Sequence, residues 1–205
     1  MRMRSNFVYA ALIAMAALPG PAFAQGANSA AVTENAAGNQ SQDASPSQRL
    51  NTLFSQLKHE GNAEKAKAIS ETIRLQWRDS GSPTVNLLML QADKAVADNK
   101  DMVAFDYLDE VIQLDPHYVE GWNQRATLNF KLGNFKKSMS DINRVLALEP
   151  RHFGAIAGMA TILTNYGRDE LAMEAWQRFL DIYPAERRAQ KALGDIADKL
   201  AGSRT

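Results

Sequence analysis

Apolar residues recur every three or four positions from Ser47 onward, which is the spacing of one face of an α-helix. Leu50, Leu53 and Leu57 form the first such stripe, and the dipeptide Gly61-Asn62 interrupts it. A second stripe follows and ends in a turn rich in serine, glycine and proline. No stretch alternates between apolar and polar residues for long enough to predict a strand. The pattern therefore predicts an all-α domain.

A longer period overlies the helical one. Pro116, Pro150 and Pro184 are 34 residues apart, and Pro83 precedes the first of them by 33. Alignment on these prolines gives columns of residues of one size class. Three columns hold large apolar residues: the first is Leu88, Trp122 and Ile156, the second is Leu108, Ile142 and Trp176, and the third is Val111, Val145 and Phe179. Two columns hold small residues: one is Ala92, Ala126 and Ala160, and the other is Ala104, Ser138 and Ala172. A further column, Asn99, Gly133 and Gly167, has residues typical of a turn.

Such columns have a physical explanation. Each period has room for two helices of about 13 residues joined by a tight turn, and one such pair cannot bury its apolar face alone. Small residues let the two helices of a pair approach closely, and large residues fill the space between successive pairs. A proline after the second helix cannot continue it, so the chain reverses into the next pair.

The period and its columns resemble the tetratricopeptide-repeat (TPR) family. The residues that carry the resemblance best are Trp122, Ala126, Gly133, Phe135, Ser138, Ile142, Val145 and Pro150. It covers three full repeats, at residues 85–116, 119–150 and 153–184, and a degenerate repeat at about 48–82. The resemblance implies a right-handed α-solenoid of antiparallel helix pairs within residues 48–201. About five extra residues precede Pro83, so regular packing of the first repeat stays open.

The segment after the last repeat, residues 185–201, has the pattern of a terminal helix. Ala189, Leu193, Ile196 and Leu200 form one apolar stripe, and charged residues cover most of the remaining surface. A helical solenoid needs a terminal element with one apolar and one polar face. We therefore expect a capping helix here.

Residues 1–24 are typical of a secretory signal peptide. Two arginines precede an apolar run from Phe7 to Leu18, and Ala22-Phe23-Ala24 is a cleavage pattern of small residues. The run is shorter than the roughly 20 apolar residues of a membrane-spanning helix. We expect the general secretory route, cleavage after Ala24 and a periplasmic protein. Residues 25–47, poor in large apolar side chains, predict a disordered linker.

The composition narrows the classes of function. The 205 residues include 23 basic and 23 acidic side chains, and this balance argues against nucleic-acid binding. Apolar residues make up 45% of the chain, enough for a core. There is no cysteine, which excludes a lipid-anchored lipoprotein and any disulfide. An exported domain of this kind depends on its core for stability.

No constellation of residues predicts catalysis or a metal site. His59, His117 and His152 are not spaced as metal ligands, and the last two occupy similar turns of successive repeats. No strand precedes a glycine loop that could hold phosphate. We predict no cofactor, no metal and no enzymatic activity.

The TPR resemblance also implies a binding surface, because in that family the first helix of each pair lines a concave face that binds an extended peptide or a helix. The residues expected there are Asn86, Met89, Asp93, Glu120, Asn123, Thr127, Phe130, Lys131, Thr161 and Asn165. Their amides and hydroxyls suit hydrogen bonds to an extended backbone. Some family members clamp the terminal carboxylate of chaperones with cations; here Met89 and Asp93 stand where cations would be expected. Gly154 and Gly158 indicate close packing or an open groove floor.

These patterns favour a non-catalytic periplasmic scaffold or adaptor that binds a protein or peptide partner, in cell-envelope assembly or maintenance. No membrane span is expected after cleavage. Two alternatives stay open: a self-associating structural protein of the envelope, and a module that contacts peptidoglycan or another glycan. The glycan alternative requires exposed aromatic side chains in the groove, and Phe130, which lies outside the apolar columns, is the one candidate.

Overall fold

The structure, a computed structural model, describes residues 45–202. In that range the chain forms α-helices and no strand, which confirms the all-α prediction. The helices are α1 (Pro46–His59), α2 (Ala63–Arg78), α3 (Pro83–Ala97), α4 (Asp101–Leu114), α5 (Val119–Lys131), α6 (Phe135–Leu148), α7 (Phe153–Asn165), α8 (Asp169–Ile182) and α9 (Arg187–Gly202). The predicted signal peptide, residues 1–24, and residues 25–44 of the predicted linker lie outside the described residues.

The first helix begins inside the segment that the composition indicates as linker. Ser45 is its N-cap: the Ser45 hydroxyl accepts from the Gln48 amide at 3.2 Å, and the Gln48 side chain accepts from the Ser45 amide at 2.8 Å. Pro46 occupies the first helical position, where its missing N–H costs nothing. A capping box with a following proline is the local signal that starts α1.

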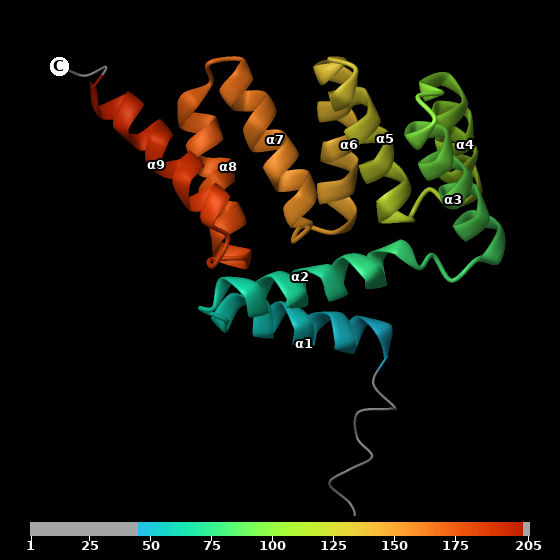
Figure 1. Ribbon diagram of the computed structural model, residues 1–205, viewed down its shortest axis with the longest axis horizontal. Helices are drawn as coiled ribbons and strands as arrows, with labels where there is room; N and C mark the ends of the chain where they lie inside the picture. Colours follow the sequence, from blue (N-terminus) through green and yellow to red (C-terminus); the bar gives the residue numbers. More distant parts are fainter. Residues whose placement is uncertain (1–44, 203–205) are drawn as a thin grey trace, which may run out of the picture. The chain divides into compact units, whose positions relative to one another are not determined.

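Three antiparallel pairs, α3–α4, α5–α6 and α7–α8, stack side by side, and α9 packs on α8 (Figure 1). The residues of the turn column adopt the left-handed backbone conformation that glycine and asparagine favour. Gly133 and Gly167 have φ of 74° and 66°, and Asn99 at the equivalent turn has φ of 57°. Glycine and asparagine adopt this left-handed conformation at the lowest cost, so they close the turn between the helices of a pair.

The small columns are buried where the two helices of a pair pack together. Ala126 is 2% exposed, and the buried Ser138 hydroxyl donates to the Ala126 carbonyl oxygen at 2.8 Å. We expect Ala126→Leu to lower the free energy of unfolding by about 1–3 kcal/mol, because the larger side chain would push α5 and α6 apart. Urea denaturation measures the loss. An unchanged midpoint would contradict the repeat register.

The sequence leaves open whether the first helix pair packs as a regular layer of the solenoid, and the structure shows that the α1–α2 hairpin does not. Its two helices do not stack on α3–α4 but lie across the turns that join successive pairs (Figure 1). The Trp77 ring stacks on His152 in the turn before α7, with centroids 4.1 Å apart. The Tyr118 hydroxyl, in the turn before α5, donates to the carbonyl oxygen of Arg78 at 2.8 Å.

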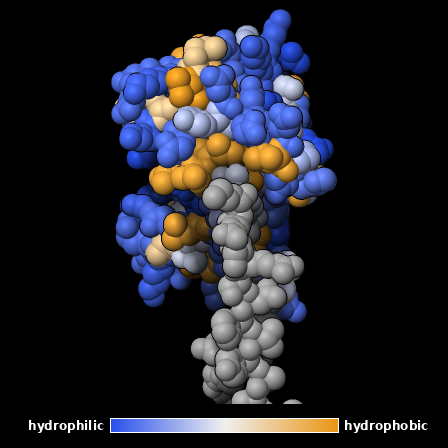
Figure 2. Space-filling view, turned by 90° about the vertical axis from the view of Figure 1, so that its right-hand side faces the viewer, coloured by the Kyte–Doolittle hydropathy of each residue, from blue (hydrophilic) through white to orange (hydrophobic). Residues whose placement is uncertain are grey.

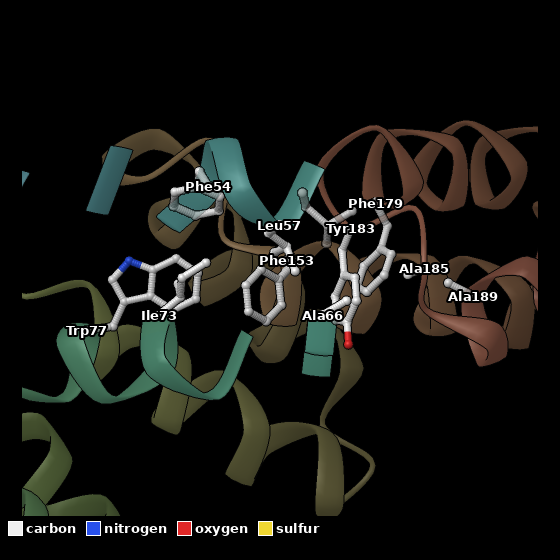
Figure 3. Packing of buried hydrophobic residues seen from close by; sticks show 11 residues of the cluster. Phe54, Leu57, Ala66, Ile73, Trp77, Phe153, Phe179, Tyr183, Ala185 and Ala189 are labelled. Atoms are coloured by element: carbon white, nitrogen blue, oxygen red, sulfur yellow. The ribbon is translucent and has the colours of Figure 1, made fainter. Parts of the chain in front are cut away.

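A large apolar cluster explains why the hairpin packs there. Phe153, fully buried, lies between Trp77 of α2 and the rings of Phe179 and Tyr183, with centroid distances of 5.1, 6.3 and 6.0 Å (Figure 3). Leu57 of α1 is also fully buried in this cluster. Burial of aromatic side chains of this size stabilises the docked position of the hairpin.

Among the helices of the described chain, none is both long and apolar enough to cross a membrane. Most exposed side chains of these helices are polar, and Leu87 and Leu90 of α3 are exceptions. The fold thus places three first helices, α3, α5 and α7, in a row, and adds α2 across one edge of that row (Figure 1).

Candidate functional site

A groove of about 260 Å³ lies between α5 and α7, above residues of α6. Its lining residues are Asn123, Ala126, Thr127, Phe130, Ser138, Ile142, Gly154, Ala155, Ala157, Gly158 and Thr161. Four of the residues expected on the binding face meet here: Asn123, Thr127, Phe130 and Thr161. The groove is concave because most of the other lining residues are small.

Two glycines keep the α7 side of the groove open. A Cβ atom on Gly158 would lie 3.3 Å from Cδ1 of Ile142, and one on Gly154 would lie 3.3 Å from Cε1 of His152. Both distances are tighter than ordinary van der Waals contact. The glycines therefore serve both of the roles that their spacing indicates, because they allow close packing and add no side chain of their own to the groove floor.

The polar groups of the groove are held in place by their own helices. The Thr127 hydroxyl donates to the carbonyl oxygen of Asn123, and the Thr161 hydroxyl donates to that of Ala157, both at 2.8 Å. The Asn123 amide donates to Glu120 at 3.1 Å. Each of these donors is used, but the hydroxyl oxygens and the Asn123 carbonyl oxygen can still accept hydrogen bonds. The groove thus offers acceptors to N–H groups between apolar surfaces.

Two residues expected on the binding face are buried, so their assignment to that face is wrong. Met89 is 5% exposed in the α3–α4 core, because its side chain fills space between the two helices of the pair. Glu120 is 9% exposed, and its carboxylate lies 3.4 Å from Nε2 of His152. The α1–α2 hairpin also covers Glu120, since Trp77 of α2 stacks on the same histidine.

The remaining four expected residues lie outside the groove. Asp93 forms an ion pair with Arg78 of α2. Asn86 stabilises the connection between α2 and α3. Its side-chain oxygen, Oδ1, accepts a hydrogen bond from the hydroxyl of Ser80 at 2.7 Å. Lys131 pairs with Asp101 at 3.2 Å. Asn165 is exposed at the end of α7 and is not among the lining residues.

A second cavity, of about 520 Å³, adjoins the groove and shares Gly154 and Ala157 with it. Its other walls come from α2, α8 and the start of α9, including Ser70, Trp176 and Arg187. No pattern in the sequence predicts this cavity, because repeat periodicity describes contacts between neighbouring pairs only. Here α2 meets helices about 80 to 120 positions further along the chain.

The buried histidine of this region has a structural role. Nδ1 of His152 accepts from the backbone amide of Ala155 at 3.1 Å and so caps the start of α7. Nε2 faces the carboxylate of Glu120. Across residues 45–202 no group of three or more His, Asp or Glu side chains is placed to hold a metal ion. His152 therefore supports the turn on which the α2 hairpin packs.

Tyr118 links stability to pH. It is 7% exposed, and burial raises the pKa of its hydroxyl well above the ordinary value of 10, with a further contribution from Glu120. In the unfolded chain tyrosine loses its proton near pH 10, whereas the folded protein retains it. The folded state then binds more protons, so stability falls as the pH rises above about 10.

We expect Tyr118→Phe to reduce this alkaline loss of stability. The variant should lose about 0.5–1.5 kcal/mol at neutral pH, because the hydrogen bond to Arg78 is missing. Between about pH 9 and pH 11 its stability should fall less steeply than that of the parent. Urea denaturation across this range measures both slopes, and equal slopes would contradict the assignment to Tyr118.

The stacked helix pairs, with a groove on their first helices, define an all-α repeat scaffold. No family model matches the sequence. A TPR repeat-containing protein of Rhizobium etli is 60% identical over 161 residues, which are 78% of this chain and 79% of the relative. The chain therefore belongs to the tetratricopeptide-repeat family, as the spacing of its prolines indicates.

Solved TPR structures share the fold. The first TPR domain of Spaghetti (RPAP3), solved with an HSP90 peptide, has a TM-score of 0.55 at 24% identity, over 58% of this chain and 95% of that domain. MamA has a TM-score of 0.54 at 17% identity, over 69% of this chain and 84% of MamA. At these identities the likeness concerns the fold alone. A TPR fold suggests a scaffold for protein–protein interaction.

Proposed function

We propose that this protein is a non-catalytic adaptor that holds a peptide segment of a partner protein in the groove between α5 and α7. The observation that carries the proposal is the groove itself, where Asn123, Thr127, Phe130 and Thr161 surround a floor of small residues. TPR proteins are generally non-catalytic scaffolds. The solved TPR domain of Spaghetti binds a peptide, which supports the same kind of ligand here.

The groove favours an extended segment with small or medium apolar side chains. Its acceptors, the hydroxyl oxygens of Thr127 and Thr161 and the carbonyl oxygen of Asn123, can receive backbone N–H groups of the ligand. The floor of glycine and alanine leaves room for the side chains that alternate toward it. Ordering a flexible segment offsets much of the contact energy, so we expect affinities of roughly micromolar Kd.

The N-terminal sequence supports a proposal for the location of the protein. The pattern of residues 1–24 supports export by the general secretory route, with the adaptor acting in the periplasm in assembly or maintenance of the cell envelope. The glycan alternative has less support, because the Phe130 ring packs edge-on against Phe135 with centroids 5.4 Å apart. A ring held in that way is not an open platform for a sugar.

Site-specific photo-crosslinking in cells identifies the partner. A photoreactive residue in place of Thr127 should trap a defined protein, whereas the same residue in place of Thr72 should not. Thr72 is a matched control: it is exposed on α2, and its hydroxyl donates to the carbonyl oxygen four residues earlier, as that of Thr127 does. Equal crosslinking from both positions would contradict the groove assignment.

The same two positions give a binding prediction. Thr127→Arg should weaken binding of the trapped partner by about tenfold or more, because the long side chain would fill the narrow groove. Thr72→Arg should bind like the parent. Isothermal titration calorimetry measures both affinities, and circular dichroism confirms that both variants are folded. Loss of binding in the Thr72 variant alone would place the function on another surface.

A further inference from the structure

The end of the helix stack formed by α3 carries apolar side chains that no other part of the described chain covers. Leu87 and Leu90 lie on one face of α3 and are 56% and 61% exposed. Figure 2 views the molecule from the side where α3 and α4 lie and shows hydrophobic surface among hydrophilic residues. Apolar side chains gathered on one helix face are typical of an interaction surface.

The internal repeat shows what this face does elsewhere in the molecule. The positions 34 and 68 residues after Leu87 are Gly121 and Ala155, and both are buried. A Cβ atom on Gly121 would lie 2.7 Å from Val111 of the preceding pair. Gly158, which corresponds to Leu90, faces Ile142 of the preceding pair in the same way. In each later repeat this helix face therefore receives a preceding helix pair.

On α3 the face is open because the α1–α2 hairpin packs elsewhere. The buried apolar residues of the hairpin, including Phe54, Leu57 and Trp77, pack against α7, α8 and α9. They cannot cover α3 at the same time. Leu87 is also larger than its equivalents Gly121 and Ala155, and Leu90 is larger than Gly158, its equivalent in the last repeat. Leucines there do not suit a tight repeat-to-repeat contact, and they project from the end of the stack.

We propose that this face is a dimer interface, in which α3 of a second copy of the chain packs antiparallel on α3 about a two-fold axis. Leu87 and Leu90 of each copy would then meet the same residues of the other. Head-to-tail stacking is blocked at the opposite end of the repeat array. There α9 closes the stack, and its exposed surface is charged, with Lys191 and Asp195 paired at 2.6 Å.

The charges near this face complement each other in the proposed arrangement. Lys94 lies one helical turn beyond Leu90, and within the described residues its ammonium has no ion-pair partner. Its equivalents in the next repeats are the buried Leu128 and Ile162. In an antiparallel pair each Lys94 approaches the beginning of α3 in the other copy, where Asp79 lies.

Asp79 is suited to that contact. Its carboxylate accepts from the backbone amide of Gly81 at 3.0 Å and from the side-chain amide of Asn86 at 3.1 Å. These hydrogen bonds, first that of Gly81, lower the pKa of Asp79, so the group is charged at neutral pH. One oxygen holds both hydrogen bonds, and the other remains for the ammonium of Lys94 of the second copy. A two-fold pair would form this contact twice.

Sedimentation equilibrium of the protein purified from cells that express the full chain tests the proposal. We expect a concentration-dependent dimer, and we expect Leu87→Asp combined with Leu90→Asp to weaken it by about tenfold or more. Both leucines are exposed, so circular dichroism should show a folded variant. Leu114→Asp, at a leucine of α4 that is 51% exposed, is the matched control and should dimerise like the parent.

A charge swap then tests the orientation. Lys94→Glu and Asp79→Lys should each weaken the dimer. The double variant should restore it, because the antiparallel arrangement brings position 94 of one copy next to position 79 of the other. A parent protein that stays monomeric to high concentration would overturn the proposal, as would a dimer that the leucine substitutions leave unchanged. Failure of the swap to restore would overturn the antiparallel arrangement. The groove is not involved, so partner binding is tested separately.

Discussion

Trp77→Ala is expected to release the α1–α2 hairpin from the rest of the domain. Trp77 is 8% exposed and contacts three rings: His152 at 4.1 Å, Phe153 at 5.1 Å and Phe54 at 5.8 Å between centroids. Truncation of a buried tryptophan removes about 3–5 kcal/mol from the free energy of unfolding. For a domain of this size the melting temperature should fall by roughly 6–20 °C.

The location of the effect distinguishes undocking from general loss of stability. Hydrogen exchange of backbone amides should accelerate most in residues 46–78, because the hairpin makes few contacts with α3 and is held by the cluster around Phe153. Leu75→Ala is the control, since Leu75 is on the same helix and 68% exposed. If exchange rises evenly over all the helices, the hairpin is not a separately anchored unit.

The same cluster shows what repeat periodicity can and cannot predict. Columns such as Ala126 and Gly133 predicted the helix pairs, their close approach and their turns, because those contacts are between neighbours along the chain. The docking of Trp77 on His152 joins residues that are 75 positions apart, and no period describes it. One clue was chemical: Leu87 stands where the later repeats have Gly121 and Ala155.

The sequence predicted some of the groove residues and not others, because repeat periodicity describes contacts between neighbouring helix pairs only. Thr127, Phe130 and Thr161 lie in it because they are on first helices whose neighbours follow the repeat. Met89 and Glu120 lie outside the groove, because burial of a side chain depends on the residues that pack against it. Glu120 lies against His152, which the α1–α2 hairpin covers, and the repeat register could not predict the position of that hairpin.

A buried charge cluster holds the wall of the groove opposite α7. Asp141 of α6, with 6% of its side chain exposed, accepts two hydrogen bonds from Arg125 of α5, at 2.7 and 3.1 Å. The Asn129 amide, also buried, donates to the same carboxylate at 3.2 Å. Arg125 makes a further ion pair with Asp109 of α4 at 2.6 Å, but 60% of the Asp109 side chain is exposed. One arginine thus joins three helices.

Asp141→Ala should therefore destabilise the protein far more than Asp109→Ala. Loss of Asp141 leaves the Arg125 guanidinium and the buried Asn129 amide without their main partner, which costs about 3 kcal/mol. Loss of Asp109 removes a solvent-screened pair worth about 0–1 kcal/mol. Urea denaturation of both variants measures the difference; similar losses would mean that burial does not decide the strength of this cluster. Because Arg125 and Asn129 are both on α5, the Asp141 variant should also bind the groove partner more weakly at temperatures where it is still folded.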